Sequence, residues 1–235
     1  MTKISIIIPI LNEAKTIANL LNYLLKTSSK ENIAEIMVVD GGSTDNSVDI
    51  VSTFKNIMLI HSEKGRAKQM NLGAQKATGS ILYFLHADSF PPINFDQYIL
   101  NAVENGHFAG CFKMKFDSNH WWLKLAGWFT KFSWGICRGG DQSLFITKTL
   151  FNDIGGYDEN YFIYEDNILI KKLYTIVRFK VIQKTLLTSA RLYEKHGVLK
   201  LQYHFLIIHL KHWLGANAST LYDYYTKNIA QMRLE

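Results

Sequence analysis

Polar side chains follow three strongly apolar segments in the first half of the chain, at the point where each segment ends. His86 and Asp88 come directly after ILYFL, and Asp40 closes EIMVVD. Asn12 and Glu13 follow KISIIIPI. Carboxylate oxygens are the ligands of hard divalent cations, which are often shared with substrate phosphates. One such carboxylate is more often a turn or capping residue, but three segments that end this way favour a binding site.

The segments that carry these residues alternate with amphipathic helices. Strands are expected at 3–10, 35–40, 56–62 and 80–85. Asn12 is expected to cap the helix after the first of them. Because the strands are continuously apolar, they predict a parallel sheet that is covered by helices on both faces. Ligands of such sheets bind beyond the carboxyl ends of the strands, where the polar residues gather.

A basic segment, KGRAKQMN, begins at Lys64 and surrounds a predicted helix start. Gly65 opens this helix, and Arg66 and Lys68 flank its first turn. The free N–H groups and the positive dipole end of a helix suit a diphosphate, although a solvated basic turn is the alternative. The glycine-rich motifs G-x-G-x-x-G and G-x-x-x-x-G-K-[ST] are absent, which argues against the usual dinucleotide and nucleoside triphosphate sites.

Composition sets the class of protein and its partners. The chain has 235 residues, of which 48% are hydrophobic, so it can build the core of one large domain. Cys111 and Cys137 show no disulfide spacing, which favours a reducing, cytoplasmic compartment. Ser5 and Pro9 interrupt the first apolar run, which predicts a strand and not a signal peptide. The net charge of +6 favours phosphates or anionic membranes, without the basic helix of a nucleic-acid-binding protein.

Five motifs, taken in chain order, resemble family-2 glycosyltransferases with the GT-A fold. They are SIIIPILNE, VVDGGSTD, GRAKQMNLGAQKATG, LHADS and GGYDENYFIYED. The chain also resembles a compact bacterial subgroup whose metal motif has the form H-A-D. The resemblance spans residues 3–196. It implies an α/β domain over 1–196, with a Rossmann-like, mostly parallel sheet flanked by helices, and a C-terminal helical extension over 197–235.

The resemblance implies a nucleotide-sugar site. Its residues would be Pro9, Asn12, Glu13, Asp40, Arg66, His86 and Asp88. Asp40 would lie near the base or ribose, and Arg66 near a uracil or the diphosphate. Asp88, at the last position of the D-x-D motif, would hold the Mg²⁺ or Mn²⁺ that bridges both phosphates. His86 stands at the first position of that motif, where it departs from the common pattern, and would contact the ribose or support the metal site.

The second half of the chain carries the predicted acceptor side. FAGCFKMKF predicts an antiparallel strand, and the resemblance makes Asp141 and Gln142 acceptor contacts. Glu165 and Asp166 fall in the first turn of a predicted helix, where acidic residues are ordinary capping electrostatics. The resemblance makes them the E-D motif, with Asp166 as the general base. Adjacent helical residues point in different directions, so only one should reach the acceptor hydroxyl.

The implied activity is transfer of a sugar from a nucleotide-diphosphate sugar, in the first place a UDP-sugar, to an acceptor hydroxyl. The reaction would depend on a metal and invert the configuration at the anomeric carbon of the sugar. The absence of the Q-x-x-R-W motif predicts single transfers. A nucleotidyltransferase is one alternative, but it needs an N-terminal glycine-rich loop that PILNEAKT lacks. A non-catalytic, membrane-associated binding protein is another, against which Asp40, Asp88 and Asp166 together argue.

Two further segments, 121–136 and 197–215, are rich in apolar and aromatic residues. Both are too interrupted by polar residues to span a bilayer. Their Trp and Lys side chains suit a membrane interface, which predicts peripheral attachment to the inner face of the membrane. Packing on the main domain, or on a second subunit in a homodimer, is the alternative. His209 and His212, three residues apart, are expected to be exposed and not to share a metal.

Overall fold

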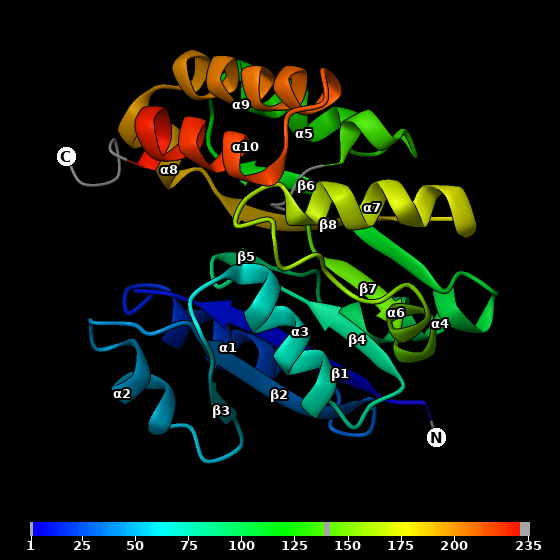
Figure 1. The fold of residues 1–235 in the computed structure, drawn as a ribbon. Coiled ribbons are helices and arrows are strands. Elements are labelled where there is room, and N and C mark those ends of the chain that lie inside the picture. The colour runs from blue at the N-terminus through cyan, green and yellow to red at the C-terminus, as the bar shows by residue number, and fades with distance from the viewer. Residues whose placement is uncertain (1, 139–141, 231–235) are drawn as a thin grey trace.

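A mixed sheet runs through both halves of the chain. In the computed structural model, which describes residues 2–138 and 142–230, its strands follow the order β3-β2-β1-β4-β7-β6-β8-β5 (Figure 1). The strands are β1 (Ile4–Ile10), β2 (Ile33–Asp40), β3 (Met58–His61), β4 (Ile81–Phe84), β5 (Ser89–Phe90), β6 (Ala109–Asp117), β7 (Leu144–Thr147) and β8 (Lys180–Ser189). The helices are α1 (Ile17–Thr27), α2 (Ser47–Ser52), α3 (Arg66–Lys76), α4 (Phe95–Glu104), α5 (Trp121–Phe129), α6 (Lys148–Asp153), α7 (Glu165–Ile176), α8 (Arg191–His196), α9 (Val198–Trp213) and α10 (Ala218–Tyr225), with a short 3-10 helix η1 (Gly135–Cys137) and a π-helix η2 (Thr226–Ala230).

The N-terminal part of the sheet is parallel. β1 pairs in parallel with β2 and β4, and β2 pairs in parallel with β3. β7 then runs antiparallel to both β4 and β6, while β6 and β8 are parallel and β5 is antiparallel to β8. The predicted α/β class and the mostly parallel sheet are therefore confirmed. FAGCFKMKF lies in β6, which pairs antiparallel with β7 through Ala109 and Gly110 but parallel with β8 along the rest of its length, so the predicted antiparallel pairing holds only on the β7 side.

The central strand β1 is buried on both faces because its side chains alternate between two apolar clusters. Ile6 and Ile8 join the cluster that includes the apolar face of α1, whereas Ile7 joins the cluster beneath α3. Gly73 allows α3 to lie close to the strand, since a Cβ atom there would stand 2.5 Å from Cγ2 of Ile7. The continuous run of isoleucines thus reflects two helical layers around one strand.

Asn12 does not cap α1, contrary to the sequence-based prediction. The helix begins at Ile17, with Thr16 in the N-cap position. Asn12 has a left-handed backbone (φ 58°), and its Oδ1 accepts a hydrogen bond from the backbone N–H of Thr44 at 2.8 Å. A turn at Glu13 separates the strand from the helix, so Asn12 is too early in the chain to act as the cap.

The C-terminal extension packs back onto the rest of the chain. Leu201 and Ile208 of α9 and Leu221 of α10 are buried in the same apolar cluster as Leu123 of α5. Figure 1 shows α9 and α10 on the α5 side of the molecule, above β6 and β8 as drawn. One face of the 197–215 segment is thus covered by the chain itself. Within the described residues, no helix is both long enough and apolar enough to cross a membrane.

Candidate active site

The loop after β1 is joined to the loop after β2 by several hydrogen bonds. The backbone N–H of Asn12 donates to Oγ of Ser43 at 2.9 Å, and that of Glu13 donates to Oγ of Ser47 at 2.8 Å. Oδ1 of Asn12 in turn accepts a hydrogen bond from the backbone N–H of Thr44. The polar residues that follow two neighbouring strands therefore meet at one edge of the sheet, as predicted.

Asp40 ends β2 and organises the turn that follows it. Its side chain is almost fully buried and accepts hydrogen bonds from the backbone N–H groups of Gly42 at 3.0 Å and of Ser43 at 3.1 Å. Nδ1 of His61, at the end of the neighbouring β3, lies 3.7 Å from Asp40 Oδ2. Asp40 thus stabilises a turn, which is the role expected of a single carboxylate at the end of a strand. It also lies at the edge of the sheet where a ligand is expected.

A second set of contacts joins β1 to the end of β4 through an arginine from α8. Nη2 of Arg191 donates to both carboxylate oxygens of Glu13, at 2.6 and 2.8 Å. The same nitrogen lies 3.4 Å from Oδ2 of Asp88. Arg191 therefore sets the spacing of two carboxylates from different strands and reduces the repulsion between them.

The basic helix start and the acidic helix start face each other across the site. Arg66, the first residue of α3, forms an ion pair with Glu165, the first residue of α7. Nη2 of Arg66 also lies 3.4 Å from Oδ2 of Asp166. Glu165 is completely buried and Asp166 nearly so, whereas about a third of the Arg66 side chain remains exposed.

Tyr157 lies beneath this acidic pair. Burial first, and then the charges of Asp166 and Glu165, raise the pKa of its hydroxyl well above the usual range. The hydroxyl therefore stays protonated at neutral pH. Asn71 of α3 fixes the loop that carries Tyr157, because it accepts from the Tyr157 N–H and donates to the Tyr157 carbonyl, both at 2.9 Å.

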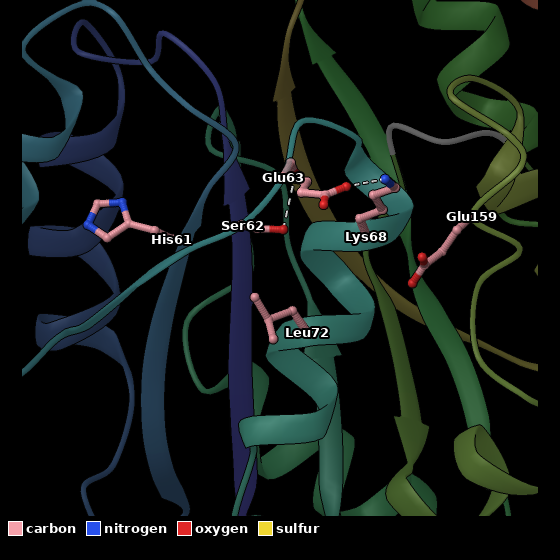
Figure 2. Close-up of a pocket in the computed structure, with 6 residues that line it drawn as sticks. All are labelled: His61, Ser62, Glu63, Lys68, Leu72 and Glu159. Atoms are coloured by element: carbon pink, nitrogen blue, oxygen red, sulfur yellow. Dashed lines mark hydrogen bonds and ion pairs between the residues drawn. The ribbon is translucent and has the colours of Figure 1, made fainter.

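Two hollows flank these residues. One of about 620 Å³ opens along the outer side of α3 and is lined by His61, Ser62, Glu63, Lys68, Leu72 and Glu159 (Figure 2). Its Lys68 and Glu63 pair with each other at the start of α3. A smaller one, of about 180 Å³, is lined by Asp88 and by Asp117 at the end of β6, among others. Asp88 thus reaches open space, whereas the larger hollow adjoins the site at His61 and at the start of α3.

The sequence profile of glycosyl transferase family 2 matches residues 5–168. This span holds the residues just described, apart from Arg191. The chain belongs to glycosyl transferase family 2.

The alignments between this chain and its curated relatives cover only part of each protein. Glycosyltransferase AglE of Haloferax volcanii is 32% identical over 94 residues, which cover 37% of this chain and 31% of AglE. A PGL/p-HBAD biosynthesis glycosyltransferase of Mycobacterium tuberculosis is 29% identical over 181 residues, or 69% of this chain and 66% of that protein. The chain thus spans about a third of AglE and two thirds of the mycobacterial protein.

The solved structures that match show the fold. TarS of Staphylococcus aureus, residues 1–349 in complex with UDP, superimposes with a TM-score of 0.67 at 21% identity, covering 80% of this chain and 60% of that one. The predicted GT-A fold of this family-2 glycosyltransferase chain is therefore confirmed.

The remaining predicted residues lie in different surroundings. Pro9 is buried within β1, paired with Val39 of β2, and His86 is half-buried just after β4. Gln142 is buried against Cys111, whose Sγ lies 4.0 Å from Gln142 Oε1. Asp141 lies outside the described residues. The structure thus brings Asn12, Glu13 and Asp40 together at one edge of the sheet. Arg191 links Asp88 to Glu13, and Arg66 contacts Glu165 and Asp166.

Sequence reasoning missed three polar residues that hold this site together. Arg191 lies far along the chain from Glu13 and Asp88, and Tyr157 reads as an ordinary turn residue. Gln69, buried in α3, donates from Nε2 to the carbonyls of Ile10 at 2.8 Å and Val39 at 2.7 Å, and so joins the ends of β1 and β2. Of these three residues, only Gln69 had a recognisable signal in the sequence, because it is a glutamine on the apolar face of a helix.

Asp88 fits a divalent cation that is shared with a ligand. Within the described residues, no group of three or more His, Cys, Asp or Glu side chains is arranged to hold a metal by itself. Mg²⁺ commonly binds one or two carboxylates and completes its coordination with substrate phosphates. The Asp88 side chain, about a quarter exposed and beside a small hollow, supplies such a carboxylate.

Proposed function

We propose that the chain transfers a sugar from a nucleotide-diphosphate sugar to an acceptor hydroxyl. The observation that carries the proposal is the contact of Arg66 with Glu165 and Asp166, which puts a cation for the donor beside a carboxylate for the acceptor. Family membership supports the reaction class. Solved TarS structures contain UDP and UDP-GlcNAc, which favours a UDP-sugar as the donor.

The donor would lie along the carboxyl edge of β1, β2 and β4. Asn12, Glu13 and Asp40, with Pro9 behind them, form the walls that we assign to the nucleoside. His86 would contact the ribose or support the metal site. The N-terminal end of α3 offers free N–H groups and the exposed part of Arg66 to the diphosphate.

Asp88 would hold Mg²⁺ or Mn²⁺ against the diphosphate. When bound, such a cation neutralises the negative charge that develops on the departing nucleoside diphosphate. Arg191 would keep Asp88 and Glu13 at a fixed spacing before the ligand arrives. Arg66 adds a second positive charge on the leaving-group side.

Asp166 would take the proton of the acceptor hydroxyl. Glu165 is fully buried against Arg66, so its role is to hold that arginine, whereas Asp166 also faces Tyr157. One base opposite the leaving group means a single displacement through an oxocarbenium-like transition state. This displacement would invert the configuration at the anomeric carbon of the sugar. Gln142 would lie on the acceptor side, and the chain would make single transfers.

We also propose that the protein acts in the cytoplasm, at the inner face of the membrane. Residues 1–196 would be the catalytic domain and 197–235 a helical extension, and the chain would attach through 121–136 or 197–215. The outward face of α9 carries exposed apolar residues at alternating spacings of four and three: Leu199, Tyr203, Leu206, Leu210 and Trp213. α9 contains no acidic residue, so two copies would bring like charges together. An anionic lipid surface is therefore favoured over a homodimer.

Thermal shift and hydrolysis assays test the proposed reaction. A panel of nucleotide-sugars is added with and without Mn²⁺, and the melting temperature is followed. We expect UDP-sugars to stabilise the protein only when Mn²⁺ is present, with slow release of UDP. Stabilisation by nucleoside triphosphates and sugar phosphates, with release of pyrophosphate, would instead favour a nucleotidyltransferase.

A further inference from the structure

Tyr164 has an unusual backbone conformation at a critical position. It is the N-cap residue of α7 and directly precedes Glu165 and Asp166. Its φ of 71° and ψ of 1° place it in the left-handed region, which bulky L-residues rarely adopt. Such a conformation persists only where surrounding contacts stabilise it. The first turn of α7, with its two carboxylates, therefore depends on whatever holds Tyr164.

The contacts that hold Tyr164 come from the C-terminal helix α9. The Tyr164 hydroxyl lies 2.7 Å from Nδ1 of His209, a hydrogen bond between two side chains 45 residues apart. The two rings pack edge to face, with their centroids 5.0 Å apart. His212, one turn further along α9, packs on the same tyrosine with a centroid distance of 4.8 Å.

This arrangement links α9 to the carboxylates of the site through one residue. Glu165 and Asp166 contact Arg66 only while the start of α7 keeps its place. If Tyr164 relaxed to a right-handed or extended conformation, the helix start would turn and both carboxylates would move. A shift of about 1 Å in a reacting group is enough to reduce a rate about 100-fold.

We propose that His209 is a positioning residue that acts through Tyr164. Its hydrogen bond holds Tyr164 in the left-handed conformation, and this aims Glu165 and Asp166 at Arg66 and the acceptor. The helical extension is then part of the catalytic apparatus as well as an attachment. The inference rests on the proposed function, because it assigns the purpose of the contact to sugar transfer.

Three substitutions test the contact. Tyr164→Phe removes the hydroxyl and keeps the ring, and His209→Ala removes the partner. Tyr164→Gly allows the left-handed conformation without strain but has neither ring nor hydroxyl, so it keeps the test informative if the others fold poorly. We expect transfer, measured as kcat, to fall about 10-fold to 100-fold in Tyr164→Phe and His209→Ala, with the affinity for UDP and Mn²⁺ unchanged. The loss should be smaller in Tyr164→Gly, which adopts the left-handed conformation without the His209 contact. His209→Asn, which places an amide near Nδ1, should recover part of the loss.

His204→Ala is the matched control. His204 lies on the same helix and makes the same kind of bond, 2.9 Å from its Nδ1 to the hydroxyl of Tyr224, but Tyr224 belongs to α10 and not to the site. This variant should keep the wild-type kcat. An equal loss of kcat in His204→Ala and His209→Ala would overturn the proposal, because it would mean that α9 docking alone matters.

Hydrogen exchange separates this inference from the proposed function. Exchange of the backbone amides over 160–170, measured by mass spectrometry, should accelerate in Tyr164→Phe and His209→Ala but not in His204→Ala. If no nucleotide-sugar is used by the wild type, the proposed function fails while this exchange pattern still reports on the positioning. Unchanged exchange over 160–170 in both variants would overturn the positioning role, whatever the activity.

Discussion

Arg66 is shared between the two halves of the proposed reaction. Its guanidinium pairs with the fully buried Glu165 and approaches Asp166, yet about a third of its side chain remains open to a ligand. Removing one partner of a buried ion pair leaves the other charge without compensation, which costs more than the pair itself contributes. Glu165 and Asp166 must therefore be tested by isosteric amide substitutions that keep the size of each side chain.

The two carboxylates should differ in their effect on transfer. We predict that Asp166→Asn binds UDP and Mn²⁺ like the wild type while kcat falls by a factor of about 10² to 10⁴, the scale of general-base loss. Glu165→Gln should reduce kcat less, since its side chain holds Arg66 and does not meet the acceptor. The measurement is steady-state transfer combined with calorimetric titration of UDP. Full activity in Asp166→Asn with none in Glu165→Gln would reverse the two roles.

Asp88 should control metal-dependent binding. Asp88→Ala is expected to fold normally but to bind UDP equally weakly with and without Mn²⁺, because the cation loses its carboxylate. Asp117→Ala is the matched control, since Asp117 lines the same small hollow at the end of β6. Calorimetric titration measures both variants. A persistent gain in UDP affinity on adding Mn²⁺ to Asp88→Ala would rule out this metal ligand.

At the scale of secondary-structure elements, α3 contacts several of the segments that form the site. Arg66 at its start contacts α7, Asn71 in its second turn holds the Tyr157 loop, and Gln69 between them joins the ends of β1 and β2. These side chains leave the helix in different directions because successive residues turn by about 100°. One amphipathic helix therefore connects segments from both halves of the chain.

Gln69→Ala should destabilise the protein without changing any proposed catalytic group. The substitution removes the Gln69 donor from the carbonyls of Val39 and Ile10, of which Ile10 keeps its bond from the backbone N–H of Gly41, and this loss of buried hydrogen bonding costs about 1–3 kcal/mol. Gln75→Ala, at an exposed position of the same helix, is the matched control and should leave the free energy of unfolding within about 0.5 kcal/mol of wild type. Urea unfolding measures both. Equal stability of the two variants would mean that Gln69 does not join the strands.

The whole molecule has apolar and cationic surface on the α5 and α9 side. Trp121, Trp128 and Trp134 are more than half exposed, and Nζ of Lys131 lies 3.7 Å from the ring centre of Trp128. Between Trp121 and Arg138 the chain has no acidic residue. Exposed tryptophan and lysine together are typical of surfaces that rest at lipid headgroups.

Liposome flotation tests this surface. We predict that the protein floats with anionic vesicles and not with neutral ones, and that Leu206→Glu combined with Leu210→Glu abolishes flotation. Ile93→Glu is the matched control, because Ile93 is even more exposed than the two leucines but precedes α4. Light scattering is measured in parallel. A dimer that the α9 substitutions dissociate, with no flotation of the wild type, would make α9 a subunit interface.

The sequence by itself determined the parallel half of the fold and the edge at which the polar residues gather. Dense runs of β-branched residues and helical spacing are local properties, so they could be read without tertiary information. The E-D pair at the start of α7 was also predicted correctly as the start of a helix. The assignment of Asn12 as a helix cap was wrong, because a turn intervenes before α1.

Only the tertiary structure decided which of these residues act together. Arg66 meets Glu165 across 99 residues, and Arg191 meets Glu13 across 178. The left-handed Tyr164 and its partner His209 are 45 residues apart, in segments whose sequence patterns show no relation to each other. Such pairings depend on where each later segment of the chain packs against the earlier ones. The free energy that selects this packing is distributed over the whole apolar core. No local pattern records it, so the partners of the charged residues emerge only once the core is packed.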